Sequence, residues 1–520
     1  MNSKRAIDVV LAGATAILLV ACGGSSSGTP GGSVTYTVGG TVSGLTGTVV
    51  LQNNDVDNIS ITTNSPFSFP TAIATGNTYN VKVLTQPAGQ NCIVSNGSGT
   101  VSSNVTTVSV VCGAPWAGTK QLGAATANTY AYSVANDANG NVYVAGYTDG
   151  GLDGNTLTGT NNFFVTKYNS SGEKQYTRQL GAGMTFGYSV ATDASGNVYV
   201  AGATNVGLDG NTKAGTYDFF VTKYNSAGEK QYTRQLGVSG AITYGYSVAT
   251  DASGNVYVAG YTNGGLDGNT LTGTYDFFVT KYNSAGVKQY TRQLGAVGAS
   301  TQGHSVATDA SGNVYVAGNT YGGLDSNTLM GTTDFFVTKY DSAGVKQYTR
   351  QLGPIGSSAN GKSVATDASG NVFVAGWTNG ALDGNAVASL DFYVTKYDAA
   401  GVKQYTRQLG VATKVAQGYS VATDVSGNVY VAGATNGSLD GNTLTGGYDL
   451  FVTKYNNAGV KQYTRQLGVA TKNTYGNAVT VDVGGNVFVA GYTNGGLDGN
   501  TLTGVQDLFV SKYDSIGVKQ

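Results

Sequence analysis

The amino-acid sequence predicts an all-β protein: a seven-bladed β-propeller of four-stranded blades, preceded by a small β-sandwich. Composition is the first reason, because glutamate occurs only at Glu173 and Glu229 while tyrosine, valine and threonine abound, which favours strands over helices. The second is a segment of the form GNVYVAG that occurs seven times at nearly constant spacing. The third is that the last repeat lacks its final segment, and matching residues stand before the first repeat.

The same composition excludes several classes of protein. Glycine contributes 79 residues but proline only 6, which excludes a collagen. Charged residues make up 11 %, too few for a disordered chain solvated by its charge. Lys and Arg total 28 against 29 Asp and Glu, so no nucleic-acid partner is expected. His304 is the only histidine and there are three cysteines. The chain therefore has few ligands for zinc or haem and few side chains for a Ser-His-Asp triad.

Residues 1–21 have the features of a signal peptide. Lys4 and Arg5 supply the positive start, and the apolar run Val9–Ala21 is too short to span a bilayer of ~30 Å comfortably. The segment Leu19–Cys22 resembles the lipobox of bacterial lipoproteins. This resemblance implies that Cys22 carries the lipid, palmitate included. In such lipoproteins an Asp after the cysteine favours retention in the inner membrane. Gly23 stands there instead, so the resemblance favours the outer membrane. A plain secretory signal with an incidental cysteine is the alternative.

Residues 22–33 are rich in Gly and Ser and are expected to form a flexible tether. Residues 34–114 contain short alternating apolar runs separated by turns, typical of an antiparallel sandwich of about seven strands and of an immunoglobulin-like accessory module. Cys92 and Cys112 are the pair that remains once Cys22 is lipidated. Export to an oxidising compartment therefore predicts a disulfide between them.

Residues 115–520 contain the repeats. The GNVYVAG-type segments begin at intervals of 56 to 58 residues, at Gly140, Gly196, Gly254, Gly312, Gly370, Gly427 and Gly485. Within one unit the sequence predicts four strands, at Tyr246–Thr250, Asn255–Thr262, Asp276–Tyr282 and Lys288–Leu294. Four strands per unit without helices indicate a propeller, and a linear solenoid is the alternative.

The chain ends favour the closed ring. The last unit stops at Gln520, before the YTRQLG segment that completes the others. Thr119–Gly123 aligns with Thr177–Gly181, so this N-terminal segment is predicted to supply the fourth strand of the last blade. A solenoid has no reason to divide a repeat in this way.

The motifs DASGNVYVAGYT and DFFVTKYNSAG, which recur through residues 116–520, resemble the seven-bladed β-propeller repeat family of bacterial envelope and secreted proteins. The resemblance implies the fold but says little about activity, because similar blades occur in lyases and in protein-binding scaffolds.

Both long connections of each unit are predicted on one face, the top face, and both tight turns (DASGN and NSAG) on the bottom face. The loop after QLG differs between units and is expected to discriminate ligands, through residues such as Phe186, Thr301, Ser358 and Thr474. The other top loop is repeated and acidic, and it predicts a ring of like charge around the axis. Its aspartates are candidate ligands for a partner or for Ca²⁺; they are Asp153, Asp209, Asp267, Asp325, Asp383, Asp440 and Asp498. Local Asx turns explain the same residues without a metal. No cofactor is therefore expected, and Ca²⁺ is the one alternative.

His304 occupies a slot that holds Tyr, Lys or Asn in the other units, which indicates a tolerant position and no catalyst. No catalytic residue is therefore predicted. The sequence favours a lipid-anchored, non-catalytic envelope propeller that is monomeric and binds a protein or glycan through its top face. An envelope lyase or glycan hydrolase that uses the top-face aspartates is one alternative, and structural or adhesive surface display is another.

Overall fold

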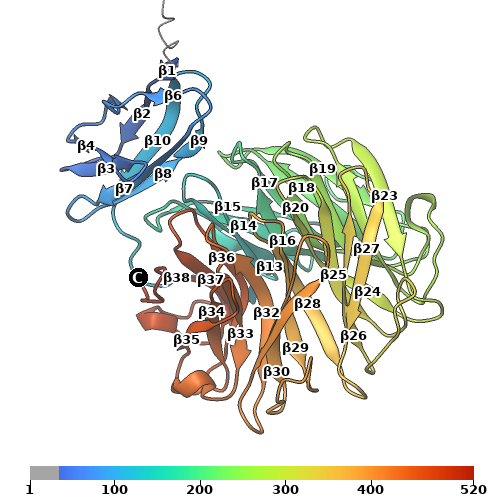
Figure 1. The fold of residues 1–520 in the computed structure, drawn as a ribbon. Helices are drawn as coiled ribbons and strands as arrows, with labels where there is room; N and C mark the ends of the chain where they lie inside the picture. Colours follow the sequence, from blue (N-terminus) through green and yellow to red (C-terminus); the bar gives the residue numbers. More distant parts are fainter. Residues whose placement is uncertain (1–33) are drawn as a thin grey trace, which may run out of the picture.

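The computed structural model describes residues 34–520, which form a small β domain followed by a ring of four-stranded blades (Figure 1). The predicted signal peptide, Cys22 and the tether lie outside the described residues. Among residues 34–520, no helix has the length and apolar character needed to cross a bilayer.

The small domain has two four-stranded sheets, of order β5-β2-β10-β8 and β4-β3-β7-β9, and a separate β1-β6 pair. Its strands are β1 (Thr35–Tyr36), β2 (Val38–Ser43), β3 (Val49–Asn53), β4 (Asp57–Ile61), β5 (Pro66–Ser68), β6 (Ile73–Ala74), β7 (Thr78–Thr85), β8 (Asn91–Ser95), β9 (Ser98–Thr100) and β10 (Val105–Gly113). Val38 and Val110 from one sheet pack with Leu51 and Val81 from the other, so the two sheets share one core.

Two expectations for this domain have different outcomes. The disulfide between Cys92 and Cys112 is present and joins β8 to β10. The purely antiparallel arrangement is wrong at one pair, because β10 runs parallel to β2. Alternating apolar residues specify which face of a strand is buried but not the direction of its neighbour, which explains the error.

The ring consists of seven blades, and each strand of a blade pairs with the next in antiparallel order. The innermost strands are β12 (Thr129–Asn136), β16 (Thr185–Thr192), β20 (Thr243–Thr250), β24 (Thr301–Thr308), β28 (Ala359–Thr366), β32 (Ala416–Thr423) and β36 (Thr474–Val481). The second strands are β13 (Val142–Thr148), β17 (Val198–Thr204), β21 (Val256–Thr262), β25 (Val314–Thr320), β29 (Val372–Thr378), β33 (Val429–Thr435) and β37 (Val487–Thr493).

The third strands are β14 (Asn162–Tyr168), β18 (Asp218–Tyr224), β22 (Asp276–Tyr282), β26 (Asp334–Tyr340), β30 (Asp391–Tyr397), β34 (Asp449–Tyr455) and β38 (Asp507–Tyr513). The outermost strands are β15 (Lys174–Leu180), β19 (Lys230–Leu236), β23 (Lys288–Leu294), β27 (Lys346–Leu352), β31 (Lys403–Leu409) and β35 (Lys461–Leu467), and β11 (Lys120–Leu122) takes this place in the last blade. Short 3₁₀ turns lie at Leu152–Gly154, Leu266–Gly268, Leu439–Gly441 and Leu497–Gly499.

The blades are held together by apolar side chains on both faces of each sheet. In β21 the residues from Val256 to Ala259 are all fully buried, because neighbouring blades cover the sheet on either side. Tyr257 and Phe277 of one blade pack with Val314 and Phe336 of the next. This explains why the second and third strands are nearly continuous apolar runs.

The turn after each innermost strand lies on the bottom face, as predicted. In the third blade the Asp251 carboxylate accepts the N–H groups of Ser253 and Asn255, both at 2.9 Å, and the hydroxyl of Tyr257 at 2.8 Å. Burial alone would raise the pKa of Asp251, but these hydrogen bonds outweigh it and the pKa is lowered. Gly254 has φ +74°, a conformation that favours glycine.

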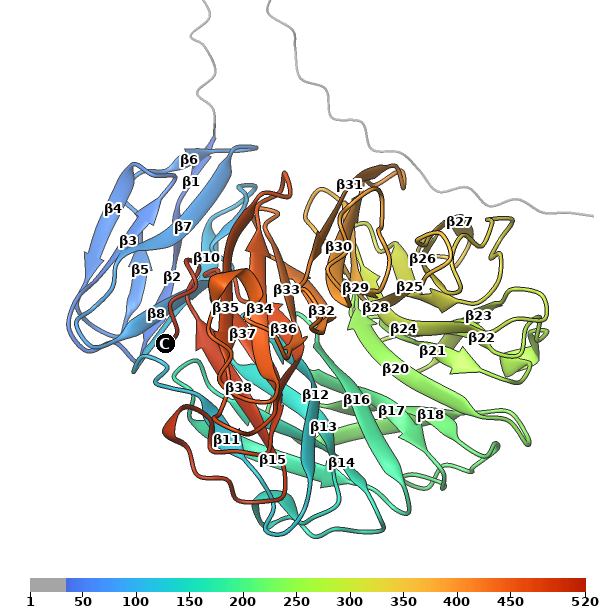
Figure 2. The same cartoon turned by 90° about the horizontal axis from the view of Figure 1, so that it is seen from below.

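The N-terminal strand of the propeller closes the ring, which confirms the prediction from the divided repeat. β11 pairs with β38, with Lys120 opposite Val510 and Leu122 opposite Leu508. The Gly118 N–H donates to the carbonyl of Gln520 at 3.1 Å, so the two chain segments meet within one composite strand. The red and teal blades lie side by side where the ring closes (Figure 2).

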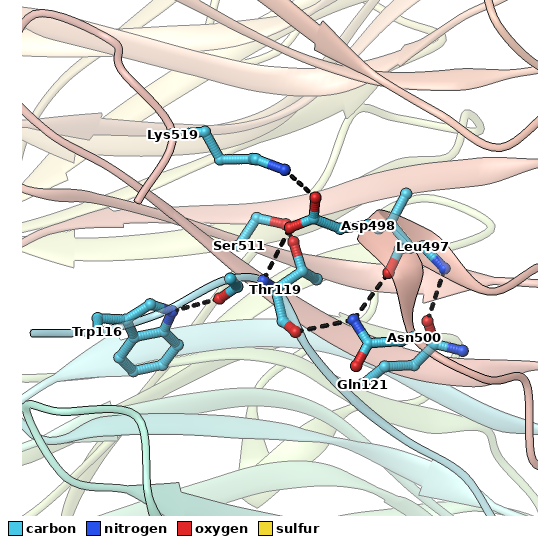
Figure 3. A network of polar contacts seen from close by, with 9 residues as sticks. Trp116, Thr119, Gln121, Leu497, Asp498, Asn500, Ser511 and Lys519 are labelled. Atoms are coloured by element: carbon cyan, nitrogen blue, oxygen red, sulfur yellow. Dashed lines mark hydrogen bonds and ion pairs between the residues drawn. The ribbon is translucent and has the colours of Figure 1, made fainter.

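At this seam the side chains make the same contacts as in the continuous blades (Figure 3). The Gln121 Oε1 atom accepts the Leu497 N–H at 2.9 Å, as Gln293 accepts the Leu266 N–H at 2.9 Å in the third blade. The Asn500 amide donates to the Thr119 carbonyl at 2.9 Å. The seam is therefore built from residues on both sides of the break.

The small domain lies against the bottom face of the propeller. The Ser95 hydroxyl donates to the Ala138 carbonyl in the first bottom turn. A cleft of about 750 Å³ between the two domains is lined by β7 and β8 and by the bottom-turn residues Val425 and Val483. The top face is on the opposite side of the ring.

Candidate binding site on the propeller axis

The repeated acidic loop does not reach the axis. In the third blade it descends along the outermost strand, where the Leu266 N–H donates to Gln293 and the Asn269 amide to the Thr291 carbonyl. Asp267 then lies beside Lys288, the first residue of that strand, and the two form an ion pair. All seven blades have this ion pair: Asp153–Lys174, Asp209–Lys230, Asp267–Lys288, Asp325–Lys346, Asp383–Lys403, Asp440–Lys461 and Asp498–Lys519.

These aspartates therefore occupy the outer rim of the ring, which differs from the acidic ring expected around the axis. The reason is local, because Asp267 has φ +57° within a 3₁₀ turn, and this turn sends the loop back along its own blade. Burial would raise the pKa of Asp325, but the hydrogen bond and charge of Lys346 outweigh it and the pKa is lowered. Among residues 34–520 no three His, Cys, Asp or Glu side chains form a group able to hold a metal ion.

A second set of aspartates anchors the same loop from inside. Asp276, the first residue of β22, is fully buried, and its carboxylate accepts the N–H groups of Thr272 and Gly273, both at 2.8 Å. The Gln293 amide donates to the same carboxylate at 3.0 Å. All of these contacts lie within one blade, so Asp276 has a structural role.

The slot that contains His304 lies on the axis. A cavity of about 600 Å³ is lined by residues from all seven blades. The seven slot residues all belong to this lining: Tyr132, Tyr188, Tyr246, His304, Lys362, Tyr419 and Asn477. The remaining lining residues are Gln302 and Tyr475, also from innermost strands, and Tyr261 and Tyr492, from the ends of second strands. Each slot residue is the fourth of the eight residues of its strand, counted from the top, and Tyr261 and Tyr492 lie near the top ends of theirs, so the cavity lies in the upper half of the ring.

Aromatic rings line this axial pocket on the first three blades, and further tyrosines line it on the sixth and seventh. Tyr188 and Tyr246 are stacked, with centroids 4.8 Å apart and planes 14° apart, and Tyr132 meets Tyr188 edge to face at 6.0 Å. At the mouth, Phe186 packs on Tyr147 at 4.8 Å. Such pairs hold each ring in a fixed orientation.

Polar groups lie between these two sets of rings, on the fourth and fifth blades. His304 Nε2 is paired with Asn319 Oδ1 at 2.6 Å, and its ring meets Tyr246 edge to face at 5.7 Å. Burial, together with the charge of Lys362, lowers the pKa of His304 to about 3. Burial also lowers the pKa of Lys362. The histidine is therefore neutral at physiological pH, and Lys362 is the one cation among the lining residues.

The lining set has the chemistry of a ligand pocket. It contains tyrosines, amides, one neutral histidine and one lysine, and none of its members is a carboxylic acid. A hydrolase of the glycosidase type needs two carboxyl groups at one spot. The arrangement offers aromatic side chains, hydroxyl and amide hydrogen-bonding groups, and one positive charge, which are features of a ligand pocket.

Sequence reasoning missed this site because it began the innermost strand too late. The innermost strand begins at Thr243, three residues before the predicted start at Tyr246, because a bulge near Gly245 allows the pairing to continue. Several residues assigned to the variable loop, such as Phe186 and Thr301, are therefore strand residues. The usable signal was the slot itself, since it varies in chemistry among otherwise similar repeats.

A family model described as a beta-propeller repeat matches residues 118–153, 175–209, 231–267, 289–325, 347–382, 404–440 and 462–498. The regulatory protein FlaEY of Caulobacter vibrioides is 29 % identical over 263 residues, covering 44 % of this chain and 26 % of that protein. An uncharacterized WD repeat-containing protein of Acanthamoeba polyphaga mimivirus is 28 % identical over 194 residues, covering 31 % and 14 % respectively. The chain spans only about a quarter or less of these curated relatives.

Among solved structures, the crystal structure of the RRP9 WD40 repeats has a TM-score of 0.44 at 10 % identity, and the match covers 76 % of this chain and 98 % of that one. The Dos1 propeller has a TM-score of 0.38 at 10 % identity, covering 73 % and 77 %. Seven matched repeats and seven four-stranded blades, the last completed by an N-terminal strand, show that the chain belongs to the beta-propeller repeat family.

Proposed function

We propose that this propeller is a non-catalytic binding scaffold of the bacterial cell envelope, which holds a protein or glycan ligand at the top-face mouth of the axial pocket. The observation that carries the proposal is the convergence of the seven slot residues on one cavity of about 600 Å³. The third and outermost strands repeat nearly the same residues from blade to blade, whereas the slot supplies different chemistry at one place. Loops and strand ends on a rigid scaffold are where binding residues concentrate.

The alternative of an envelope lyase or hydrolase has less support. The aspartates that it would use lie on the outer rim, and each one forms an ion pair with a lysine of its own blade. An enzyme needs unlike groups that converge on one reacting atom. The description of the relative from Caulobacter vibrioides as a regulatory protein also agrees with a scaffold role.

The envelope location rests on the sequence. Residues 1–21 would be removed, Cys22 would receive the lipid, and the disulfide between Cys92 and Cys112 would form in an oxidising compartment. Since the small domain lies on the bottom face, the mouth is left open to a ligand on the opposite side.

The proposal is tested by comparing a mouth variant with a bottom-face variant of the full chain. Tyr246→Ala is expected to reduce binding of a glycan or purified envelope protein, whereas Ser253→Ala in an exposed bottom turn is expected to leave it unchanged. Equal loss in both variants, or a loss only in Ser253→Ala, would refute the binding face. Labelling with palmitate tests the anchor, since Cys22→Ser is expected to abolish the label.

A further inference from the structure

The two sides of the axial pocket differ in chemistry. Tyr132, Tyr188 and Tyr246 line it on the first three blades, while Gln302, His304 and Lys362 line it on the fourth and fifth. Tyr419, Tyr475 and Tyr492 line it on the sixth and seventh blades, so a ligand meets tyrosine side chains around most of the pocket and hydrogen-bonding groups with a positive charge at one side. The positions of these groups limit the chemical class of ligand that the pocket can bind.

Lys362 has an unusual environment among the lysines of the propeller. Lys288 has an ion-pair partner in Asp267, and Lys281 donates to the carbonyl of Ser342 at 2.9 Å. Within residues 34–520, Lys362 has neither an ion pair nor a hydrogen bond, although its side chain is half-buried. Burial lowers its pKa, and no carboxylate contributes to hold the charge. A half-buried cation without a partner is stabilised by a bound anion.

The neighbouring groups do not replace that anion. His304 is neutral and is committed to Asn319. The other residues within reach of the cavity are uncharged tyrosines and amides. The side-chain amide of Gln302 has no hydrogen-bond partner in the described part of the chain, so it is available to a ligand beside Lys362.

The lining residues also bear on the class of ligand. None of them is an aliphatic residue, and all of them carry a polar group. A pocket for a protein side chain is expected to contain apolar groups at its centre. Tyrosine rings combined with hydroxyl and amide groups fit a ligand that has apolar surfaces and many hydroxyl groups, which describes a sugar.

We propose that the axial pocket binds an acidic carbohydrate, with the sugar ring beside the Tyr188 and Tyr246 side chains and its carboxylate at Lys362. The inference rests on the proposed function and adds the class of ligand. The Gln302 amide donates to the same carboxylate or to an adjacent hydroxyl group. A cavity of about 600 Å³ is large enough for a short oligosaccharide.

The test is calorimetric titration of the full chain, purified in detergent, with tetramers of galacturonic, glucuronic and mannuronic acid. The same tetramers with their carboxyl groups reduced to alcohols serve as neutral partners. At least one acidic tetramer is expected to bind about tenfold or more tightly than its reduced form. Lys362→Met is expected to abolish this preference, and Lys362→Arg to preserve it.

Lys414→Met is the matched control, because Lys414 is an exposed lysine of a top loop outside the pocket. It is expected to bind like the parent chain. Tyr246→Leu is expected to weaken the acidic and reduced tetramers equally. The melting temperature of each variant shows whether it is folded.

The outcomes separate this inference from the proposed function. Equal binding of acidic and reduced tetramers, lost in Tyr246→Leu, would overturn the role of Lys362 and leave the axial site in place. If no tetramer bound and an acidic peptide bound in their place, the assignment of a carbohydrate ligand would be overturned. Binding that is unchanged in both Tyr246→Leu and Lys362→Met would overturn the axial site itself.

Discussion

Trp116 lies over Gly172 as Tyr176 lies over Gly228. A Cβ atom built on Gly172 would be 2.9 Å from the Trp116 ring, and one built on Gly228 would be 2.9 Å from the Tyr176 ring. Trp116 therefore fills the place of the tyrosine that the divided last blade lacks. Lys120 lies 5.5 Å from the centroid of this ring, where Arg178 lies 4.8 Å from Tyr176.

Trp116→Ala is expected to loosen the closure of the ring. The indole is almost fully buried and contacts Tyr168 in the first blade and Phe488 in the last, so its removal should cost about 3 kcal/mol or more. Hydrogen exchange measures the effect, which should be largest in β11 and β38. The control is Tyr290→Ala, which removes the same contact from a continuous blade and should leave β11 protected. Unchanged exchange at β38 in Trp116→Ala would show that the seam does not depend on this ring.

The rim ion pairs are expected to contribute little to stability. Asp267 and Lys288 are both partly exposed, and exposed pairs are typically worth up to about 1 kcal/mol. Asp267→Asn should change the free energy of unfolding by no more than this, since Asn also tolerates the φ of +57°. Asp267→Ala should cost about 1 kcal/mol more, because alanine is strained there. A large loss in thermal denaturation of Asp267→Asn would contradict this description.

Calcium at the rim loops remains a prediction from the sequence that can be tested directly. Since each carboxylate is paired with a lysine, we expect EDTA to leave the melting temperature unchanged. If chelation lowered the melting temperature and calcium restored it, the aspartates would be metal ligands and the ion pairs would form only in the absence of metal.

His304 should make the protein sensitive to mild acid. Its pKa is lowered to about 3 in the folded chain from an ordinary value of about 6.5, so between these values the unfolded state binds more protons. Stability therefore falls as the pH falls through this window. Tyr246, Asn319 and Lys362 are the groups that surround the ring, and Lys362 adds to the effect.

His304→Gln tests this directly. Between pH 6.5 and 5 the parent chain should lose on the order of 1 kcal/mol that the variant retains. Asp251 and Asp309 do not interfere, because their pKa values are lowered and their contribution is lost only at more acidic pH. Parallel pH profiles of unfolding for both chains would contradict the assignment.

Two of the positions expected to tune recognition should affect stability instead. Thr301 and Thr474 are fully buried, and Thr301 pairs with the Thr320 hydroxyl at 3.1 Å. Thr301→Val should cost about 1 kcal/mol. Ser358 is part of the loop that leads into the mouth, and Ser358→Ala should leave the melting temperature nearly unchanged. Equal stability of the two variants in thermal denaturation would contradict this distinction.

Much of the fold follows from the repeated sequence. The predicted strands Asp276–Tyr282 and Lys288–Leu294 match β22 and β23 at both ends, because apolar runs, turn residues and repetition agree there. The composite strand of the last blade was also predictable, since Thr119–Gly123 carries the missing residues.

The binding site was harder to predict. The path of the Asp267 loop depends on a positive φ and on contacts with Gln293, which no periodicity reveals. The slot of His304 was recognised as variable, but its meaning depends on the ring, which brings seven separate positions to one axis. A difference between repeats becomes informative only when the position is known to face the cavity.

The most direct test of the central claim is a crystal structure of the chain with a bound uronic acid tetramer. The ligand is expected on the axis at the top face, with its rings beside the Tyr188 and Tyr246 side chains and a carboxylate within hydrogen-bond distance of the Lys362 Nζ atom. A ligand bound at the rim beside Asp267, or in the cleft between the small domain and the bottom turns, would contradict the axial site.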